Sequence, residues 1–185
     1  MATVIIRPTA FGEASSLTGF DVTGSTFISR ISDNDASTAA TQNNVTCSAT
    51  GVEFANDSTY DSQTINSITL SVTGASTGRG NPTVTCTLFN GNSTLQTSEL
   101  TFSSATTLSA DAYSTNLTPA IVNNLTATID PDGTGVALKE VFITVNYGSG
   151  AAAGYTHKVN SVAAGNIGKV NTVATANIGK INTVD

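Results

Sequence analysis

The clearest strand pattern in the chain is the stretch Thr64-Ile65-Asn66-Ser67-Ile68-Thr69-Leu70-Ser71-Val72. Successive side chains of a β-strand point to opposite faces, so Ile68, Leu70 and Val72 share one face and Thr69 and Ser71 share the other. Apolar residues on one side and hydroxyls on the other are typical of a strand with one buried face. We therefore expect this stretch to be a core strand of a β-sheet.

Similar segments occur on both sides of this strand. Seven more strands are predicted at Thr3–Arg7, Ser25–Ile31, Gly51–Phe54, Thr83–Phe89, Leu95–Phe102, Asn124–Asp130 and Val136–Tyr147. Pro8 is expected to close the first strand, and Asn90-Gly91-Asn92 and Asp130-Pro131-Asp132-Gly133 are expected to be turns. Many short strands bounded by turn residues predict an all-β fold, an antiparallel β-sandwich or jelly roll.

Little of the remaining body shows helical periodicity. Ala120–Asn124 could form one helical turn after Pro119, and no other segment is a convincing helix. The polar stretches Ser32–Asn44 and Gly74–Pro82 are expected to be surface loops.

The composition excludes several classes of partner. The chain has 185 residues, of which 11% are charged, and its net charge is -6. Nucleic-acid binding is not expected, because neutralising phosphates needs clustered Lys and Arg, whereas acidic residues outnumber basic ones in this chain. No apolar run is long enough to cross a membrane, and no signal-peptide core is visible near the N-terminus. We expect a chain made in a cytoplasm, without a nucleic-acid or membrane partner.

The C-terminal residues repeat with a period of 11. Lys158–Val162 returns as Lys169–Val173 and again as Lys180–Val184. A short repeat cannot bury its apolar side alone, so it stacks on its own copies or packs on a partner. We therefore predict a β-sandwich body at 1–147, a Gly/Ala-rich hinge at 148–154 and a repeat-containing arm at 155–185. The predicted assembly interface is the apolar set Val159, Val162, Ile167, Val170, Val173, Ile178 and Ile181.

The conformation of this arm stays open at the level of sequence. An 11-residue period is that of a right-handed coiled coil, but the repeats are rich in Gly, Val, Thr and Asn, which are poor helix formers. These residue types favour an extended or solenoid-like arm that turns at Asn-Ile-Gly, and a disordered arm is the third possibility.

No residue constellation predicts catalysis, a cofactor or a metal. His157, the sole histidine, lies beside the hinge, and the G-x-S-x-G motif of a nucleophile elbow is missing. Asp33-Asn34-Asp35 and the Asp130–Gly133 segment resemble pieces of calcium loops but lack the full ligand spacing, as do Asp57 and Asp61. We therefore expect a protein that is not an enzyme.

Cysteines and aromatic residues are few. Cys47 and Cys86 lie in β-like segments; buried thiols are the simpler interpretation, and a disulfide between facing strands is the alternative. Aromatic residues make up 6% of the chain, without Trp. Sugar-binding faces usually stack rings, so Tyr60 and Tyr113 are the positions at which a glycan site would show.

Two passages resemble proteins of tailed bacteriophages. Residues 168–182 are similar to the I-G/A-K-V/I-N-G/T-V repeats near the ends of phage fibre and capsid-associated proteins, with Thr172 and Thr183 where Gly is frequent. The segments Val4–Ala10 and Ile65–Val72 are similar to jelly-roll modules of phage decoration and appendage proteins.

This resemblance implies a virion structural protein of the marine-phage type. The first expectation is a capsid decoration, or cement, protein on the outer surface of the head. Its partner would be the major capsid protein. Decoration proteins of this kind are often homotrimers. The alternative is a head or tail fibre component that binds host surface glycans.

Overall fold

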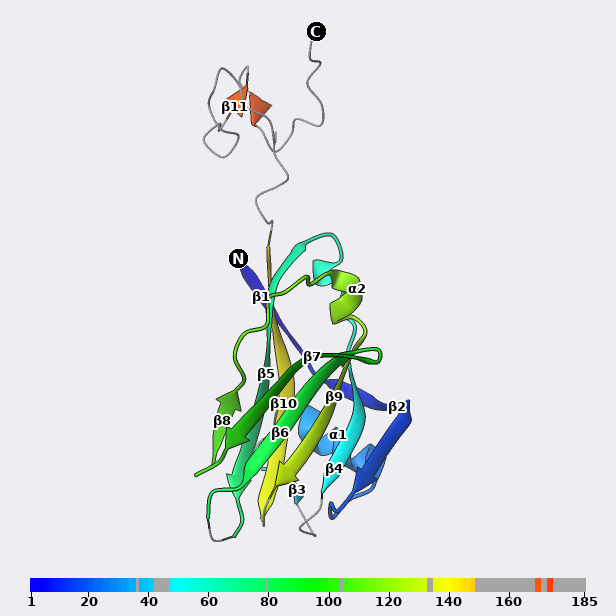
Figure 1. The fold of residues 1–185 in the computed structure, drawn as a ribbon, viewed down its shortest axis with the longest axis vertical. Coiled ribbons are helices and arrows are strands. Elements are labelled where there is room, and N and C mark those ends of the chain that lie inside the picture. The colour runs from blue at the N-terminus through cyan, green and yellow to red at the C-terminus, as the bar shows by residue number, and fades with distance from the viewer. Residues whose placement is uncertain are drawn as a thin grey trace. The chain divides into compact units, whose positions relative to one another are not determined.

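The computed structural model describes residues 1–35, 37–41, 47–78, 80–103, 105–132 and 135–148, together with 169–170 and 173–174. The chain divides into two compact units, Met1–Gly148 and Ser149–Asp185. The first unit, called the body below, contains two antiparallel β-sheets (Figure 1). In the second unit, β11 (Lys169–Val170) pairs with β12 (Val173–Ala174).

The body is a β-sandwich. The first sheet has the strand order β1 (Ala2–Ile6), β10 (Val136–Gly148), β5 (Thr64–Ser76) and β8 (Thr106–Ser109), and β3 (Ala40–Thr41) pairs with β10. The second sheet has the order β2 (Pro8–Thr18), β4 (Ser48–Phe54), β9 (Leu125–Asp132), β6 (Thr83–Asn90) and β7 (Ser93–Thr101). From β4 to β10 the chain passes from one sheet to the other at every connection except the β6–β7 hairpin. Together with β1, and leaving out β2 and β3, these strands form two four-stranded layers in the order of a jelly roll. The predicted all-β sandwich is confirmed.

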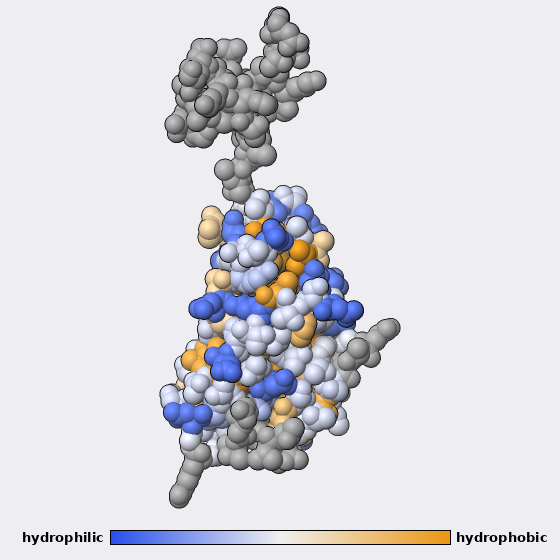
Figure 2. Space-filling view, in the orientation of Figure 1, coloured by the Kyte–Doolittle hydropathy of each residue, from blue (hydrophilic) through white to orange (hydrophobic). Residues whose placement is uncertain are grey.

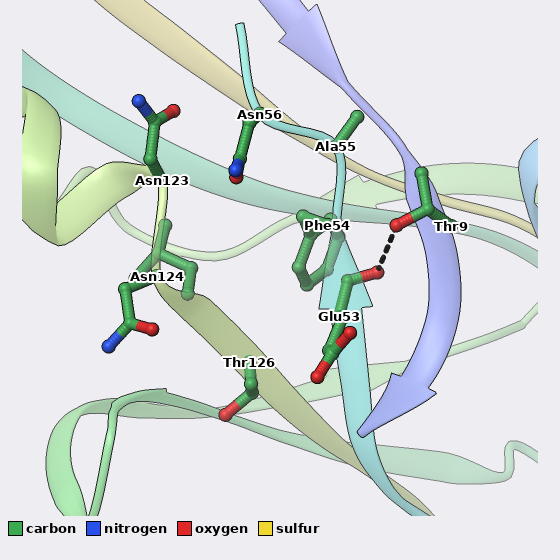
Figure 3. Close-up of a pocket in the computed structure, with 9 residues that line it drawn as sticks. Thr9, Glu53, Phe54, Ala55, Asn56, Asn123, Asn124 and Thr126 are labelled. Atoms are coloured by element: carbon green, nitrogen blue, oxygen red, sulfur yellow. Dashed lines mark hydrogen bonds between the residues drawn. The ribbon is translucent and has the colours of Figure 1, made fainter. Parts of the chain in front are cut away.

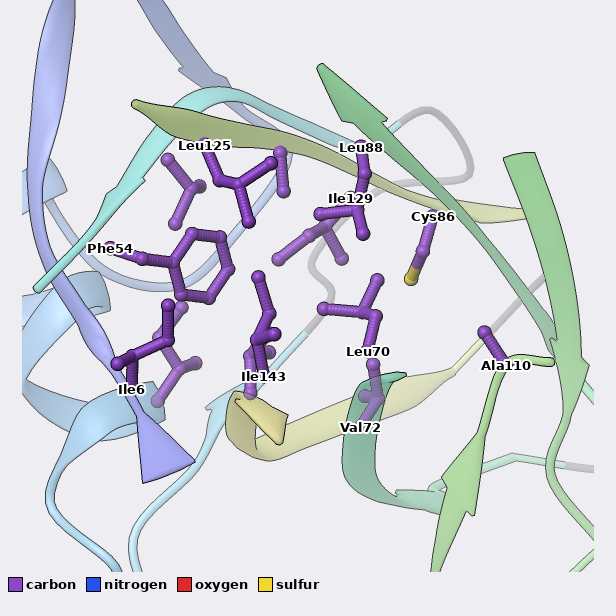
Figure 4. Close-up of a cluster of buried hydrophobic side chains, with 14 of the residues drawn as sticks. Ile6, Phe54, Leu70, Val72, Cys86, Leu88, Ala110, Leu125, Ile129 and Ile143 are labelled. Carbon is purple, nitrogen blue, oxygen red and sulfur yellow. The ribbon is translucent and has the colours of Figure 1, made fainter. Parts of the chain in front are cut away.

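The core lies between the two sheets and contains side chains from both (Figure 4). Leu70 and Ile143 from the first sheet are at most 1% exposed, as are Leu88 and Ile129 from the second. In β5, the residues that the alternation placed inward, Ile68, Leu70 and Val72, are all buried. The period-2 pattern therefore identified the buried face correctly.

The outer faces of both sheets are rich in hydroxyl groups. Neighbouring strands carry hydrogen-bonded pairs at Ser71–Ser109 (2.8 Å), Thr73–Thr107 (2.8 Å), Thr87–Thr97 (3.1 Å) and Thr83–Thr101 (3.2 Å). Figure 2 shows the result on one face, where pale residues of intermediate hydropathy predominate over isolated hydrophilic and hydrophobic ones. Neutral side chains therefore cover much of this surface.

Ser25–Ile31 is a helix, and the strand predicted there is wrong. Helix α1 spans Gly24–Ser32 and buries Phe27, Ile28 and Ile31. The Phe27 ring packs against those of Phe20 and Phe11, with centroids 4.8 and 5.8 Å away. Alternation over a few residues does not separate a strand from a helix, and this aromatic cluster, formed by tertiary contacts, favours the helical spacing.

Prolines also occupy strand positions where a strand end or a turn was predicted. Pro8 begins β2, an edge strand, where a missing N–H removes no ladder hydrogen bond. Pro131 pairs with Val84, so β9 continues to Asp132 instead of turning at Asp130. The β4 pairing reaches only Ala49↔Ile129, and Pro131 therefore lies where β9 has a neighbour on one side.

Other boundaries differ less. Strand β5 extends to Ser76, into the predicted Gly74–Pro82 loop, and β3 lies within the predicted Ser32–Asn44 loop. Strands β2 and β8 were not predicted. A helical turn was predicted at Ala120–Asn124 after Pro119, and α2 (Pro119–Val122) overlaps it but begins at the proline. The segment η1 (Ser58–Tyr60) is a further short turn.

Candidate functional site

A polar pocket lies at one end of the second sheet, where β4 ends and β9 begins. Its volume is about 540 Å³. The lining residues are Thr9, Glu53, Phe54, Ala55, Asn56, Asn123, Asn124, Leu125 and Thr126 (Figure 3). Most of their side chains carry a hydroxyl, an amide or a carboxylate, so the pocket can exchange several hydrogen bonds with a ligand.

The floor and the walls of the pocket follow from strand alternation. Phe54 and Leu125 point into the core and are 6% and 3% exposed. Glu53 and Thr126 are each one residue away and face outward. They are direct partners in the β4–β9 register, so their side chains are neighbours on the outer face. An apolar floor therefore carries a carboxylate and a hydroxyl side by side.

A network around Asn123 fixes the opposite wall. Its side-chain oxygen accepts a 2.7 Å hydrogen bond from the Tyr60 hydroxyl, and its amide nitrogen donates to Asp61 Oδ1 at 3.1 Å. Thr118 caps α2 by accepting a hydrogen bond from the Ile121 amide at 3.2 Å. The turn from α2 into β9 is thus held from both sides, and the wall is preorganised.

Two ionisable groups near this wall have shifted pKa values. Burial, reinforced by the nearby Asp57 and Asp61 carboxylates, raises the pKa of Tyr60 to about 12. Hydrogen bonds from the Thr59 hydroxyl and amide lower the pKa of Asp57, which caps η1. The Tyr60 hydroxyl therefore stays protonated at neutral pH and remains the donor to Asn123.

The Glu53 carboxylate faces the pocket without a partner in the described part of the chain. No described residue donates a hydrogen bond to it, and it is the one ionisable side chain among the nine lining residues. Gly12 gives it room, because a Cβ atom at that position would lie 2.6 Å from Glu53 Oε1. This arrangement can bind hydrogen-bond donors, but the lining has no second carboxylate for paired acid–base chemistry.

The predicted assembly residues lie almost entirely outside the described residues. Val159, Val162, Ile167, Ile178 and Ile181 are outside them, as is His157. Val170 and Val173 are partners in the register of the two-residue strands β11 and β12. The conformation of the arm stays a prediction. The hinge and arm boundaries remain predictions.

Several other predicted candidates have structural roles. Asp33 Oδ1 accepts a hydrogen bond from the Asp35 amide at 2.9 Å, and Asp35 Oδ1 accepts one from the Ser37 amide at 2.9 Å, as in ordinary Asx turns. Among the described residues, no cluster of three His, Cys, Asp or Glu side chains could hold a metal ion. No helix in that part of the chain is long and apolar enough to span a membrane.

The aromatic and cysteine candidates are buried or half-buried. Tyr60 is 0% exposed and Tyr113 is half-buried, and none of the described rings is exposed. Cys47 and Cys86 are buried thiols without a disulfide, and the Cys47 thiol donates to the Gly19 carbonyl at 2.9 Å. The structure thus supports the buried-thiol interpretation and provides no aromatic platform at Tyr60.

Sequence reasoning missed the polar pocket. Its residues come from β2, β4 and the α2–β9 turn, which are far apart in the chain. One local signal could have indicated the pocket: Glu53 is a charged residue between Val52 and Phe54 on an otherwise neutral strand. Only the sheet order shows that Thr126 is its neighbour.

Comparisons with known proteins give no family for this chain. The sequence matches no family model and no curated protein. Among solved structures, the chain is similar to the crystal structure of the Podospora anserina GH26-CBM35 β-(1,4)-mannanase, with a TM-score of 0.41 and 16% sequence identity. That similarity covers 84% of this chain and 30% of the mannanase chain.

Proposed function

We propose that this chain is a non-enzymatic structural protein of a phage virion, a capsid decoration protein. The observation that carries the proposal is the set of near-identical 11-residue repeats after a jelly-roll body. Repeated apolar positions need a surface that covers them, either sister copies or a capsid. The resemblance of the repeats to those of phage capsid-associated proteins favours the capsid.

The architecture of the body is compatible with this role. A closed β-sandwich supplies a rigid unit, and its neutral, hydroxyl-rich faces remain in contact with solvent. The arm would add buried apolar area across a subunit boundary. Each arm of a trimer need contribute only modestly, because tethering raises the effective concentration of the other arms.

Sedimentation and capsid binding test the proposal together. The full chain and a chain truncated after Gly148 are compared by analytical ultracentrifugation, and both are then mixed with capsids that lack the protein. We expect a trimeric full chain that cosediments with capsids, and a folded monomeric body that does not. A truncated chain that binds capsids as well as the full chain would overturn the proposal.

A matched pair of arm variants sharpens this test. Changing Val159, Val162, Val170 and Val173 to Thr keeps the side-chain shape and β propensity but removes apolar surface, and we expect it to abolish assembly. Changing Lys158, Lys169 and Lys180 to Gln removes charge instead and is expected to leave assembly intact. The reverse result would assign the arm to electrostatic binding.

A fibre component that binds host glycans is the second candidate function. The polar pocket beside Glu53 is the observation that favours it. The aromatic platform predicted at Tyr60 does not favour this function, because the Tyr60 ring is buried. The two functions use different parts of the chain, so arm truncation and pocket substitutions separate them.

A further inference from the structure

We infer that the pocket beside Glu53 binds a sugar that carries no negative charge. The inference deepens the glycan-binding candidate and rests on it only for the biological source of the sugar. It does not depend on the arm, because every residue that carries it belongs to the body.

The register places three kinds of side chain in one row on the outer face of the second sheet. Glu53 on β4 is opposite Thr126 on β9, and Thr126 is opposite Phe89 on β6. Phe89 points outward, because its neighbour Leu88 is buried in the core. The row therefore joins a carboxylate, a hydroxyl and the half-buried ring of Phe89, which are groups that recognise sugar hydroxyls and apolar sugar faces.

The amides complete the hydrogen-bonding set. The Asn124 amide nitrogen donates to Asn90 Oδ1 at 3.1 Å, and no described residue donates to its side-chain oxygen. Figure 3 shows Glu53, Asn124 and Thr126 around the same opening. The Glu53 carboxylate and the Asn124 oxygen can accept hydrogen bonds, while the Thr126 hydroxyl can donate or accept. A polyol, whose hydroxyls do both, matches this set.

The pocket is also prepared for binding before a ligand arrives. The hydrogen bonds of Asn123 to Tyr60 and Asp61 hold one wall, and paired strands hold the other. Little conformational order has to be gained on binding, which lowers its entropic cost. Because the half-buried ring of Phe89 neighbours Thr126 but does not line the pocket, we expect weak binding by one pocket, strengthened when several bodies are joined.

The charge of the pocket selects among hydroxyl-rich ligands. Glu53 contributes a negative charge, and the lining residues include no Lys or Arg. An anionic group about 5 Å from this carboxylate would bind about fourfold more weakly than a neutral one, even with the full dielectric screening of water. The pocket therefore favours neutral or cationic sugars over uronates and sugar phosphates.

NMR titration of the full chain tests this inference. The probes are D-glucose, D-mannose, D-galactose and N-acetylglucosamine, with D-glucuronate as the anionic counterpart. The signals to follow are the Ala55 backbone amide and the side-chain amides of Asn123 and Asn124. We expect at least one neutral sugar to shift these signals, and glucuronate to bind at least about fourfold more weakly than glucose.

Two substitutions test whether the sugar-induced NMR shifts depend on the Glu53 carboxylate. Glu53→Gln is expected to weaken binding of the neutral sugar and to remove the discrimination against glucuronate. Gly12→Ala should weaken binding by displacing the same carboxylate, since the three atoms nearest to the new Cβ all belong to that flexible side chain. Glu99→Gln removes an equal charge from β7 of the same sheet, outside the pocket, and should leave binding unchanged.

Three results would overturn the inference: no shift with any neutral sugar, glucuronate binding as tight as glucose binding, or equal losses in Glu53→Gln and Glu99→Gln. None of them affects the assembly proposal, because sedimentation of the truncated chain measures the arm. Conversely, a monomeric full chain that binds a neutral sugar would support the pocket and contradict the trimer.

Discussion

The hydroxyl of Tyr60 donates a 2.7 Å hydrogen bond to the side-chain oxygen of Asn123, 63 residues further along the chain. The Tyr60 ring is fully buried, and its centroid lies 6.0 Å from that of Tyr147 on β10. One side chain thus packs in the core and positions the turn that forms a wall of the pocket. Stability and the candidate binding site are coupled at this contact.

Replacing Tyr60 by Phe should test this coupling. The ring remains, but the Asn123 oxygen loses a donor, which should lower the free energy of unfolding by about 1 kcal/mol. Urea unfolding measures the change. Tyr113→Phe is the matched control, because no described side chain accepts a hydrogen bond from the half-buried Tyr113, and it should change stability by less than about 0.5 kcal/mol. Equal effects of the two substitutions would contradict the assigned role of Tyr60.

The protein should lose stability at alkaline pH. Burial raises the pKa of Cys86 from 9.0 to about 12, with a contribution from the Asp130 carboxylate, and burial raises that of Tyr60 from 10.0 to about 12. The folded state then holds protons that the unfolded state has released. Stability is therefore full below pH 9 and falls by about 1.4 kcal/mol per pH unit for each such group above its unfolded pKa.

The two groups can be separated by the pH at which the loss begins. Of these two groups, Cys86 titrates first in the unfolded chain, above pH 9, and Tyr60 adds to the loss above pH 10. Urea unfolding of Cys86→Ala should show lower stability below pH 9 and an onset of the alkaline loss delayed to about pH 10. An unchanged onset in this variant would show that another group causes the alkaline loss.

Gly74 should not tolerate a side chain. A Cβ atom at this position of β5 would lie 3.1 Å from the buried Phe102 ring and 3.2 Å from the Ala137 carbonyl oxygen. Because the backbone oxygen cannot move freely, Gly74→Ala is expected to cost about 1–3 kcal/mol. Gly12→Ala is a suitable comparison, since the three atoms nearest to its new Cβ all belong to the flexible Glu53 side chain. Thermal unfolding should place the Gly74 variant well below the Gly12 variant.

The coupling energy of the Arg7–Glu140 ion pair should be large enough to measure. Arg7 Nη2 lies 2.9 Å from Glu140 Oε1, the two side chains are 29% and 15% exposed, and Arg7 also donates to Asn34 Oδ1 at 3.0 Å. A double-mutant cycle should give a coupling energy of about 1 kcal/mol, at the upper end of values for surface pairs.

The more exposed pair Arg30–Asp21 serves as the comparison for that measurement. Its closest atoms are 3.5 Å apart, and the side chains are 36% and 33% exposed. We expect a coupling energy close to zero there, with added salt weakening whatever remains. A stronger coupling for Arg30–Asp21 than for Arg7–Glu140 would contradict the importance of burial.

The fold class and the buried face of most strands can be predicted from local sequence patterns. In β5, β6 and β10, the alternation of apolar and polar residues has a single solution, because a shift of one residue would expose every core side chain. The turn at Gly91 was also predicted from local residues. The φ of Gly91 is 56°, which suits glycine, and the turn joins Asn90 to Ser93 in a hairpin. These features depend on residues close together in the chain.

Other features depend on residues that are distant in the chain and follow from contacts across the fold. Phe27, Ile28 and Ile31 form a helix because the rings of Phe11 and Phe20 pack against Phe27. Pro131 remains in a strand because β4 does not extend alongside it. Glu53 and Thr126 become partners only through the order of the strands, which local periodicity does not encode. Periodicity specifies which side of a strand is buried, whereas contacts across the fold specify what each exposed side faces.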